Sequence, residues 1–241
     1  MKNNSVYGIL KNSDRITYGY SLYNGIVKSS GSGPFEYTAI DNNFSMEFDG
    51  TSDYILAPTL TGLGMGTTDK ISVSLWLKTN TTKATPVAFN AGGWPLTSGV
   101  SIYFNSTAND IYSRVNNTIV STSGTNYRDN NWHHVVICYN GSLGSDQIEL
   151  FVNGQPVATN TTTGNISGTT LGTFIGSNTD LSTGTFLGFE GRLDEVAIWN
   201  DKLSQSTIEA IYNTTNDNPG KAADLSETPE GVPVAWYRMG D

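Results

Sequence analysis

Both histidines and the only cysteine of this 241-residue chain lie in one short segment, WHHVVICYN at residues 132–140. Histidine and cysteine bind transition metals and act as bases or nucleophiles in many proteins. In a β-strand, however, adjacent side chains point to opposite faces, so His133 and His134 do not readily hold one ion together. Cys138 shares a face with His134, and both faces are otherwise largely apolar. The pattern therefore favours a central strand with packed histidines and an inert thiol.

Aromatic residues in polar loops are a second group that could bind a ligand. Trp94 lies in AGGWPLTSG and Tyr127 lies in GTNYRDN, and both segments are rich in turn-forming residues. An aromatic ring has an apolar face on which the apolar face of a sugar ring can stack. The sequence makes Trp94 and Tyr127 candidate carbohydrate platforms, and the alternative role of Trp94 is a plug at one end of the fold.

The composition restricts the class of partner. The formal net charge is −9, and charged residues make up only 15% of the chain. An acidic surface repels phosphate backbones, so we expect no nucleic-acid partner. No apolar run approaches the roughly 18 residues that span a bilayer, so we expect no membrane insertion. The N-terminal segment MKNNSVYGIL lacks a long apolar stretch, which predicts no secretory signal, and a single cysteine permits no internal disulfide.

The elements that must position these residues are predicted by the spacing of apolar side chains. Many segments alternate apolar and polar residues with a period of two, as in ISVSLWLK at 71–78, which predicts β-strands. Asn153-Gly154 between two apolar runs is a strong hairpin signal. About a dozen antiparallel strands predict an all-β protein, built as a two-sheet antiparallel jelly-roll sandwich.

One short helix is predicted near the C-terminus, in LSQSTIEAIYN at 203–213. Ser206 and Glu209 have the spacing of a capping box, and Ile208 and Ile211 fall on one helix face. We divide the chain into three parts, which are an N-terminal extension or hairpin at 1–40, a jelly-roll domain at 41–215, and a linker with a C-terminal strand at 216–241.

Four segments, in order, resemble the laminin G-like domains of the concanavalin A-like lectin/glucanase type. They are MEFDGTSDYI, ISVSLWLK, WHHVVICYNG with QIELFVNGQPV, and FEGRLDEVAIWNDKLSQSTIEAIYN, and they span about residues 44–213. The resemblance implies a concanavalin A-like jelly roll in which the histidines and Cys138 belong to a scaffold strand. In one respect the chain departs from such domains, which usually begin with a strand similar to AWW-F-D. Here the comparable segment, at 235–241, comes last, so residues 231–241 either fold back onto this sandwich or begin another module.

Enzymes of this fold include glycoside hydrolases and polysaccharide lyases, so the fold alone does not decide the activity. A retaining hydrolase needs two carboxylates about 5 Å apart. Glu190 and Asp194 lie at i and i+4 with Glu195 on the opposite face, and Glu47 and Asp49 lie just before a turn. Neither set matches the Glu-x-Asp-x-(x)-Glu pattern of such hydrolases, and the tyrosines form no lyase motif. We therefore expect no enzymatic activity.

Related folds also suggest a structural Ca²⁺ between the early Asp-Gly turn and the last strand. Ca²⁺ takes six to eight oxygen ligands, including backbone carbonyls. The candidate ligands are Asp49, Gly50, Asp53, Asp194 and, if the tail folds back, Asp241. The alternative is a solvated turn in which the aspartates cap backbone N–H groups.

The function that these observations favour is a noncatalytic recognition or attachment module that binds a glycan or a host surface. The absence of a signal and of disulfides, together with the acidic, Asn/Thr/Gly-rich composition, suits a phage virion protein in a fibre, tail or capsid surface. Other virion proteins or further copies of this chain are the expected protein partners. The alternatives are a purely structural virion decoration protein, a hydrolase or lyase of the same fold, and a piece of an extracellular or cell-surface protein.

Overall fold

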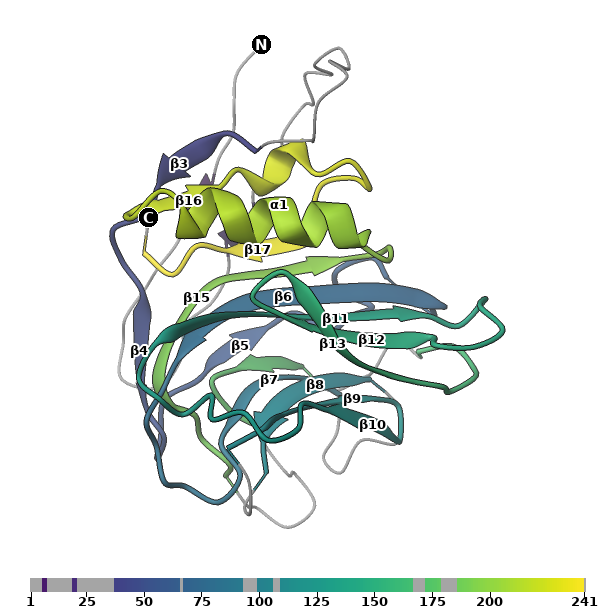
Figure 1. The fold of residues 1–241 in the computed structure, drawn as a ribbon, viewed down its shortest axis with the longest axis horizontal. Helices are drawn as coiled ribbons and strands as arrows, with labels where there is room; N and C mark the ends of the chain where they lie inside the picture. Colours follow the sequence, from purple (N-terminus) through teal and green to yellow (C-terminus); the bar gives the residue numbers. More distant parts are fainter. Residues whose placement is uncertain are drawn as a thin grey trace.

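The computed structural model describes residues 6–7, 19–20, 37–65, 67–92, 99–105, 109–166, 172–178 and 186–240. They form three layers, in which two β-sheets pack face to face and a helical layer covers the outside of one of them (Figure 1). All pairings between the strands of the two sheets are antiparallel. The predicted two-sheet antiparallel sandwich is therefore confirmed.

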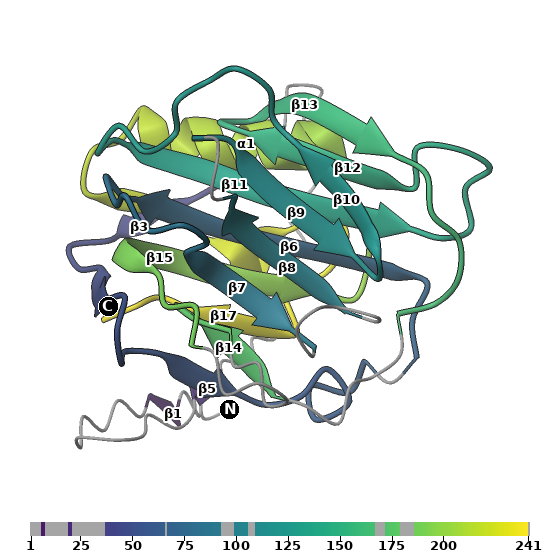
Figure 2. The ribbon, with the colours of Figure 1, turned by 90° about the horizontal axis from the view of Figure 1, so that it is seen from below.

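The first sheet has six strands in the order β10-β9-β8-β7-β14-β5. Its outer face is turned away from the second sheet and from the helix, as Figure 2 shows from below. The strands are β5 (Ile55–Ala57), β7 (Val87–Ala91), β8 (Val100–Phe104), β9 (Ile111–Val115), β10 (Thr118–Ser121) and β14 (Thr173–Ile175).

The second sheet has seven strands in the order β13-β12-β11-β6-β15-β17, with β4 also paired to β15. Its central strands, β6 and β11, pair over nine residues each, and they contain the ISVSLWLK and WHHVVICYN segments. The strands are β4 (Met46–Asp49), β6 (Lys70–Lys78), β11 (Trp132–Asn140), β12 (Ile148–Val152), β13 (Gln155–Asn160), β15 (Glu190–Trp199) and β17 (Ala235–Tyr237).

Two apolar cores follow from the alternation along these strands. One face of β11 contributes Val135, Ile137 and Tyr139 to the core between the sheets. The other face contributes Val136 and Cys138 to a second core beneath the helical layer. Since both faces of the seven-stranded sheet are covered, its central strands are buried along nearly their whole length. The outer face of the six-stranded sheet carries polar residues.

The helix α1 (Gln205–Asn216) begins two residues earlier than the capping-box pattern predicts. Its N-cap is Ser204, whose hydroxyl accepts a hydrogen bond from the Thr207 N–H, so the predicted cap at Ser206 is wrong. Glu209 instead accepts a hydrogen bond from the Gln205 side chain at 2.7 Å. Within the part of the chain that the structure describes, no helix has the length and apolar character needed to cross a membrane.

The tail after α1 is part of the same folded body. Residues predicted as a linker form β16 (Lys221–Ala223), which pairs with β3 (Ala39–Asp41), and the short helix η1 (Leu225–Glu227). β17 then pairs with β15, which is the fold-back arrangement. The apolar side chains of the segment explain why it packs, because Ala222, Ala223 and Leu225 are all buried. In residues 1–36, the structure describes only β1 (Val6–Tyr7) and β2 (Gly19–Tyr20), which pair with each other.

Candidate functional site

The adjacent histidines lie on opposite faces of β11, as predicted. His134 is fully buried, its ring stacks on Trp76 with centroids 5.1 Å apart, and its Nε2 lies 2.8 Å from Ser74 Oγ. Burial lowers the pKa of His134 to about 3, so the ring is neutral at pH 7. His133 Nε2 lies 2.9 Å from Asp129 Oδ1 on the other face. Each histidine is held by a different partner set, and the two rings do not form one site.

Cys138 also has the surroundings of a packed side chain. It is fully buried, and its Sγ lies 3.3 Å from the hydroxyl of Ser72. Burial raises the pKa of the Cys138 thiol to about 12, so almost none of it is thiolate at pH 7. A thiol in this state is a poor nucleophile and a poor metal ligand.

Of the two predicted carbohydrate platforms, Trp94 and Tyr127, the structure describes only Tyr127. Trp94 lies outside the described residues. Tyr127 is only 8% exposed, and its ring packs edge-on against His133 with centroids 5.1 Å apart. Tyr127 therefore belongs to the apolar core at one end of the sandwich, and its ring faces are not free to stack on a sugar. The turn-rich sequence around it did not reveal that the ring points inward.

The Asp49 carboxylate is already saturated by its own turn. Oδ1 accepts backbone N–H bonds from Thr51 at 2.7 Å, Ser52 at 2.8 Å and Asp53 at 3.2 Å. Oδ2 accepts from the hydroxyls of Thr51 at 2.7 Å and Ser52 at 2.9 Å. These bonds, with that from the Ser52 N–H the strongest, hold the pKa of Asp49 well below its usual range. Asp53 Oδ2 in turn accepts the Asp49 N–H at 3.0 Å.

Of the remaining predicted calcium ligands, Gly50 belongs to this turn, whereas Asp194 lies away from it. Gly50 O accepts a hydrogen bond from Lys83 Nζ at 2.6 Å. Asp49 pairs with Glu190, and Asp194 lies four residues further along β15, or about 13 Å away. Asp241 lies outside the described residues. Asp49 and Asp53 accept backbone N–H groups, as in the turn-cap alternative. Among the described residues, no three His, Cys, Asp or Glu side chains form a group that could hold a metal ion, and the calcium site stays a prediction.

The three acids on β15 differ in their exposure to solvent. Glu190 is exposed at the start of the strand, whereas Asp194 and Glu195 are 6% and 4% exposed. Asp194 pairs with Trp76, whose ring stacks on Tyr212 of α1, so Asp194 faces the helical layer. These three acids therefore do not line one open cleft in the way that glycoside hydrolysis requires.

Glu195 is a perturbed acid that strict alternation places on the face opposite Asp194. That prediction is wrong, because Asp194 and Glu195 both face the helical layer. A register shift between residues 194 and 197 gives Glu195 a φ of 47° and turns its carboxylate toward β17. It accepts hydrogen bonds from Trp236 Nε1 and, at 3.4 Å, from Arg238 Nε. Burial, reinforced by nearby Asp194, nevertheless raises the pKa of Glu195 to about 8. Strict alternation of side chains cannot predict this, because the bulge breaks the period.

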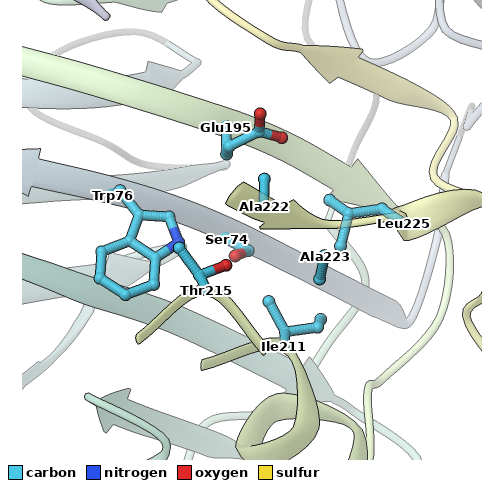
Figure 3. A pocket seen from close by; sticks show the side chains of 8 residues that line it. All are labelled: Ser74, Trp76, Glu195, Ile211, Thr215, Ala222, Ala223 and Leu225. Carbon is cyan, nitrogen blue, oxygen red and sulfur yellow. The ribbon is translucent and has the colours of Figure 1, made fainter. Parts of the chain in front are cut away.

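A small pocket lies beside Glu195, between the seven-stranded sheet and the helical layer (Figure 3). The Thr215 hydroxyl is buried there and has no hydrogen-bond partner among the described residues. The enclosed space suits about one water molecule, and it is far too small for a sugar ring. Its lining residues are Ser74, Trp76, Glu195, Ile211, Thr215, Ala222, Ala223 and Leu225.

The outer face of the six-stranded sheet gathers the side chains best suited to bind a ligand. Cross-strand partners share a face, and the register places Asn90 opposite Ser101, Ser101 opposite Arg114, and Tyr103 opposite Tyr112. The residues between them on β8, such as Ile102, point into the core. We call the following set the ligand face: Asn90, Ser101, Tyr103, Tyr112, Arg114 and Phe174.

The ligand face combines rings with polar groups. Asn90, Ser101, Tyr103 and Phe174 are buried in the structure, whereas Tyr112 and Arg114 are half-buried. The Tyr103 and Tyr112 ring centroids lie 5.7 Å apart, and the Arg114 guanidinium carbon lies 6.0 Å from the Tyr103 ring centroid. Asn90 Oδ1 and Ser101 Oγ are buried without a hydrogen-bond partner in the described part of the chain. Buried polar atoms usually have partners, so these two atoms point to a missing donor or acceptor. The segments VSIYF and IYSRV show the alternation, but the outward face becomes clear only from the order of the sheets.

Comparisons with known proteins agree with this fold. Residues 49–209 match the laminin G family model described as the concanavalin A-like lectin/glucanases superfamily. No curated protein matches the chain. A heptameric SAP-like pentraxin from Limulus polyphemus is 17% identical with a TM-score of 0.55, and the match covers 80% of this chain and 90% of the pentraxin chain.

Two further solved structures have the same fold within longer chains. A putative carbohydrate-binding protein from Bacteroides ovatus is 12% identical with a TM-score of 0.57, and the match covers 87% of this chain and 54% of that one. A Trypanosoma rangeli sialidase is 16% identical with a TM-score of 0.54, covering 73% of this chain and 28% of the sialidase chain. Identities this low establish a shared fold only.

Proposed function

Because the chain belongs to the concanavalin A-like lectin/glucanases superfamily, we propose that it is a noncatalytic module that binds carbohydrate on its ligand face. The observation that carries the proposal is the pair of buried, unpartnered polar atoms, Asn90 Oδ1 and Ser101 Oγ, beside two stacked tyrosines. Sugars offer hydroxyl groups that both donate and accept hydrogen bonds, and they offer an apolar ring face. The ligand face has a complement for each of these features.

Binding is favoured over hydrolysis by the charges on this face. Among the described strand residues that share it, Arg114 is the only charged one. Glycoside hydrolysis uses a pair of carboxylic acids flanking the bond that is cleaved. The acids that the sequence suggested as candidates lie elsewhere, on β4 and β15 of the other sheet.

The finer part of the proposal concerns where the module acts. We propose attachment to a glycan-bearing surface as its role, and the Bacteroides ovatus neighbour, described as a putative carbohydrate-binding protein, supports the ligand class. The location on a virion stays a prediction from the composition.

The test begins with a glycan array and continues with calorimetric titration of the best glycan. Ser101→Ala removes a hydroxyl that has no hydrogen-bond partner among the described residues, so it should leave the fold intact and weaken binding about fivefold to tenfold. Tyr112→Ala should weaken binding further by removing a stacking surface. Ser113→Ala is the matched control, because the Ser113 hydroxyl points to the opposite face of the same sheet and donates to Ser101 O at 2.7 Å.

Three results would contradict the proposal. The first is an array on which no glycan is retained, and the second is unchanged affinity of both Ser101→Ala and Tyr112→Ala. The third, progressive shortening of a bound oligosaccharide, would instead reveal an enzyme. Melting temperatures measured on every variant separate lost binding from lost folding.

A further inference from the structure

The corner where β4 ends and β15 begins is rich in oxygen atoms and contains one lysine. Asp49 at the end of β4 pairs with Glu190 at the start of β15, and the backbone turns at Gly50 with a φ of 69°. Thr81 Oγ1 donates to Glu190 Oε2 at 2.8 Å, and this hydrogen bond joins the loop after β6 to the same corner. We call the group formed by Asp49, Gly50, Thr81, Lys83 and Glu190 the Lys83 corner.

Lys83 is inserted into this corner rather than extended into solvent. Its Nζ donates to Gly50 O at 2.6 Å. A Cβ on Gly50 would lie only 2.7 Å from Lys83 Cε and 2.9 Å from Glu190 Cβ, so the lysine stem fills the space above the turn. The packing explains the requirement for glycine at position 50, which combines a positive φ with this close approach.

The backbone of Lys83 is fixed as well. Its N–H donates to Thr81 Oγ1 at 3.1 Å. Its carbonyl accepts from Arg128 NH1 at 2.8 Å, and the same guanidinium also donates to Asn105 O at 3.0 Å. Three hydrogen bonds among three loops therefore fix the backbone from which the lysine ammonium reaches Gly50.

The Lys83 ammonium disfavours the binding of a divalent cation to the Gly50 carbonyl oxygen. Ca²⁺ binds oxygen at 2.3–2.6 Å. Since Lys83 Nζ lies 2.6 Å from Gly50 O, a calcium ion bound to that oxygen would lie at most about 5 Å from the ammonium. Like charges at that distance repel each other, and the Asp49 carboxylate has no spare lone pair to compensate.

We propose that Lys83 is the resident cation of this corner, and that its ammonium joins the β4 turn to β15 in place of the divalent cation that the fold family suggests. The stability of the protein is then independent of calcium and depends on Lys83. This inference does not rest on the ligand face and stands or falls separately from carbohydrate binding.

The experiment compares thermal unfolding of the wild type, Lys83→Met and Lys70→Met, each in EDTA and in millimolar Ca²⁺. Methionine keeps most of the stem and removes the charge, so Lys83→Met should melt about 2–4 °C lower. Lys70 forms an ion pair with Asp201 at 3.2 Å on the surface, and Lys70→Met should melt within about 1 °C of the wild type. The wild-type melting temperature should be the same in EDTA and in Ca²⁺.

Either of two results overturns the proposal. One is a wild-type protein that contains stoichiometric calcium by elemental analysis and loses stability in EDTA. The other is a Lys83→Met variant that melts with the wild type, since the ammonium would then hold nothing. Circular dichroism of each variant at low temperature confirms that the unfolding transitions start from the same folded state.

Discussion

His134 and Glu195 are ionisable residues buried on the same side of the seven-stranded sheet, and acid and base affect them in opposite ways. Burial favours the neutral form of both. For His134 the neutral form is the deprotonated ring, whereas for Glu195 it is the protonated acid. Protonation of His134 and ionisation of Glu195 therefore each destabilise the native state.

The first prediction concerns stability in acid. An unfolded histidine has a pKa near 6.5, whereas that of native His134 is about 3. Between these values the unfolded chain binds a proton that the native chain does not, so the free energy of unfolding falls as the pH falls. His134→Gln should remove up to about 1.4 kcal/mol per pH unit from this slope. Urea unfolding at pH 7, 5.5 and 4 measures it, and an unchanged slope would contradict the prediction.

The second prediction concerns stability in base. The pKa of Glu195 is about 8 in the native state, compared with about 4.3 for an unfolded glutamate. Between these values the native chain keeps a proton that the unfolded chain has lost, so stability falls as the pH rises. Glu195→Gln stays neutral and can still accept from Trp236 Nε1. It should match the wild type near pH 5 and exceed it by about 1–3 kcal/mol at pH 8.5.

The control for this comparison is Glu195→Ala, which removes the acceptor of the Trp236 N–H and one of the acceptors of the Arg238 guanidinium. It should be less stable than the wild type at both pH values, because unpaired buried donors are costly. Equal pH profiles of the wild type and Glu195→Gln would mean that Arg238 keeps Glu195 ionised.

Residue-scale features were predicted from the sequence only where the strand period held. The opposite faces of His133 and His134 follow from alternation along β11, and the structure confirms them. Glu195 was assigned to the wrong face because the bulge moves it out of phase, and Tyr127 was misplaced because a loop has no period. Both errors have one cause, which is that side-chain direction is predictable only within regular structure.

At the scale of elements, β17 joins the C-terminus to the sandwich. Ala235 enters the core between the sheets, and Trp236 packs on the other side against the core beneath the helical layer. Pairing with β15 leaves β17 at the edge of the described sheet. The short strand β17 therefore contributes side chains to both cores, the one between the sheets and the one beneath the helical layer.

The third prediction follows from this position. Deleting residues 231–241 should lower the melting temperature and increase ANS fluorescence, because it uncovers β15 and leaves Glu195 buried without donors. Trp236→Ala should reproduce much of the loss, whereas Val232→Ala, at a side chain that is 43% exposed, should not. A truncated protein that melts with the full chain and loses only self-association would show that the strand serves another module.

Strands and turns were predictable from the sequence where a long apolar run or a clear turn signal marks them. The central strands β6 and β11 were found from their apolar runs, and the Asn153-Gly154 turn joins β12 to β13. The segment before β17 was interpreted as a linker because Pro, Gly and polar residues dominate it. Its three buried apolar residues, Ala222, Ala223 and Leu225, are too few to give a periodic signal.

At the scale of the whole molecule, the helical layer distinguishes the outer faces of the two sheets. The helical layer closes the outside of the seven-stranded sheet, so polar groups on that side are enclosed, as around Glu195 (Figure 3). The six-stranded sheet has no described helix over its outer face (Figure 1). The ordered motifs of the sequence predicted the sandwich, but they did not predict this asymmetry, because it depends on where the tail packs.

Because Cys138 is fully buried, the reaction of its thiol with an alkylating reagent can measure how often the native protein opens locally. The thiol lies under the helical layer, between Ser72 and Leu203, and no other cysteine competes for reagent. Alkylation should therefore require transient exposure, and when reclosing is fast its rate measures the population of opened molecules. We expect the mass shift of a single label to appear orders of magnitude more slowly than in urea, and to accelerate when β17 is deleted. Labelling at the rate of a free thiol would place the weakest point of the molecule directly over β11.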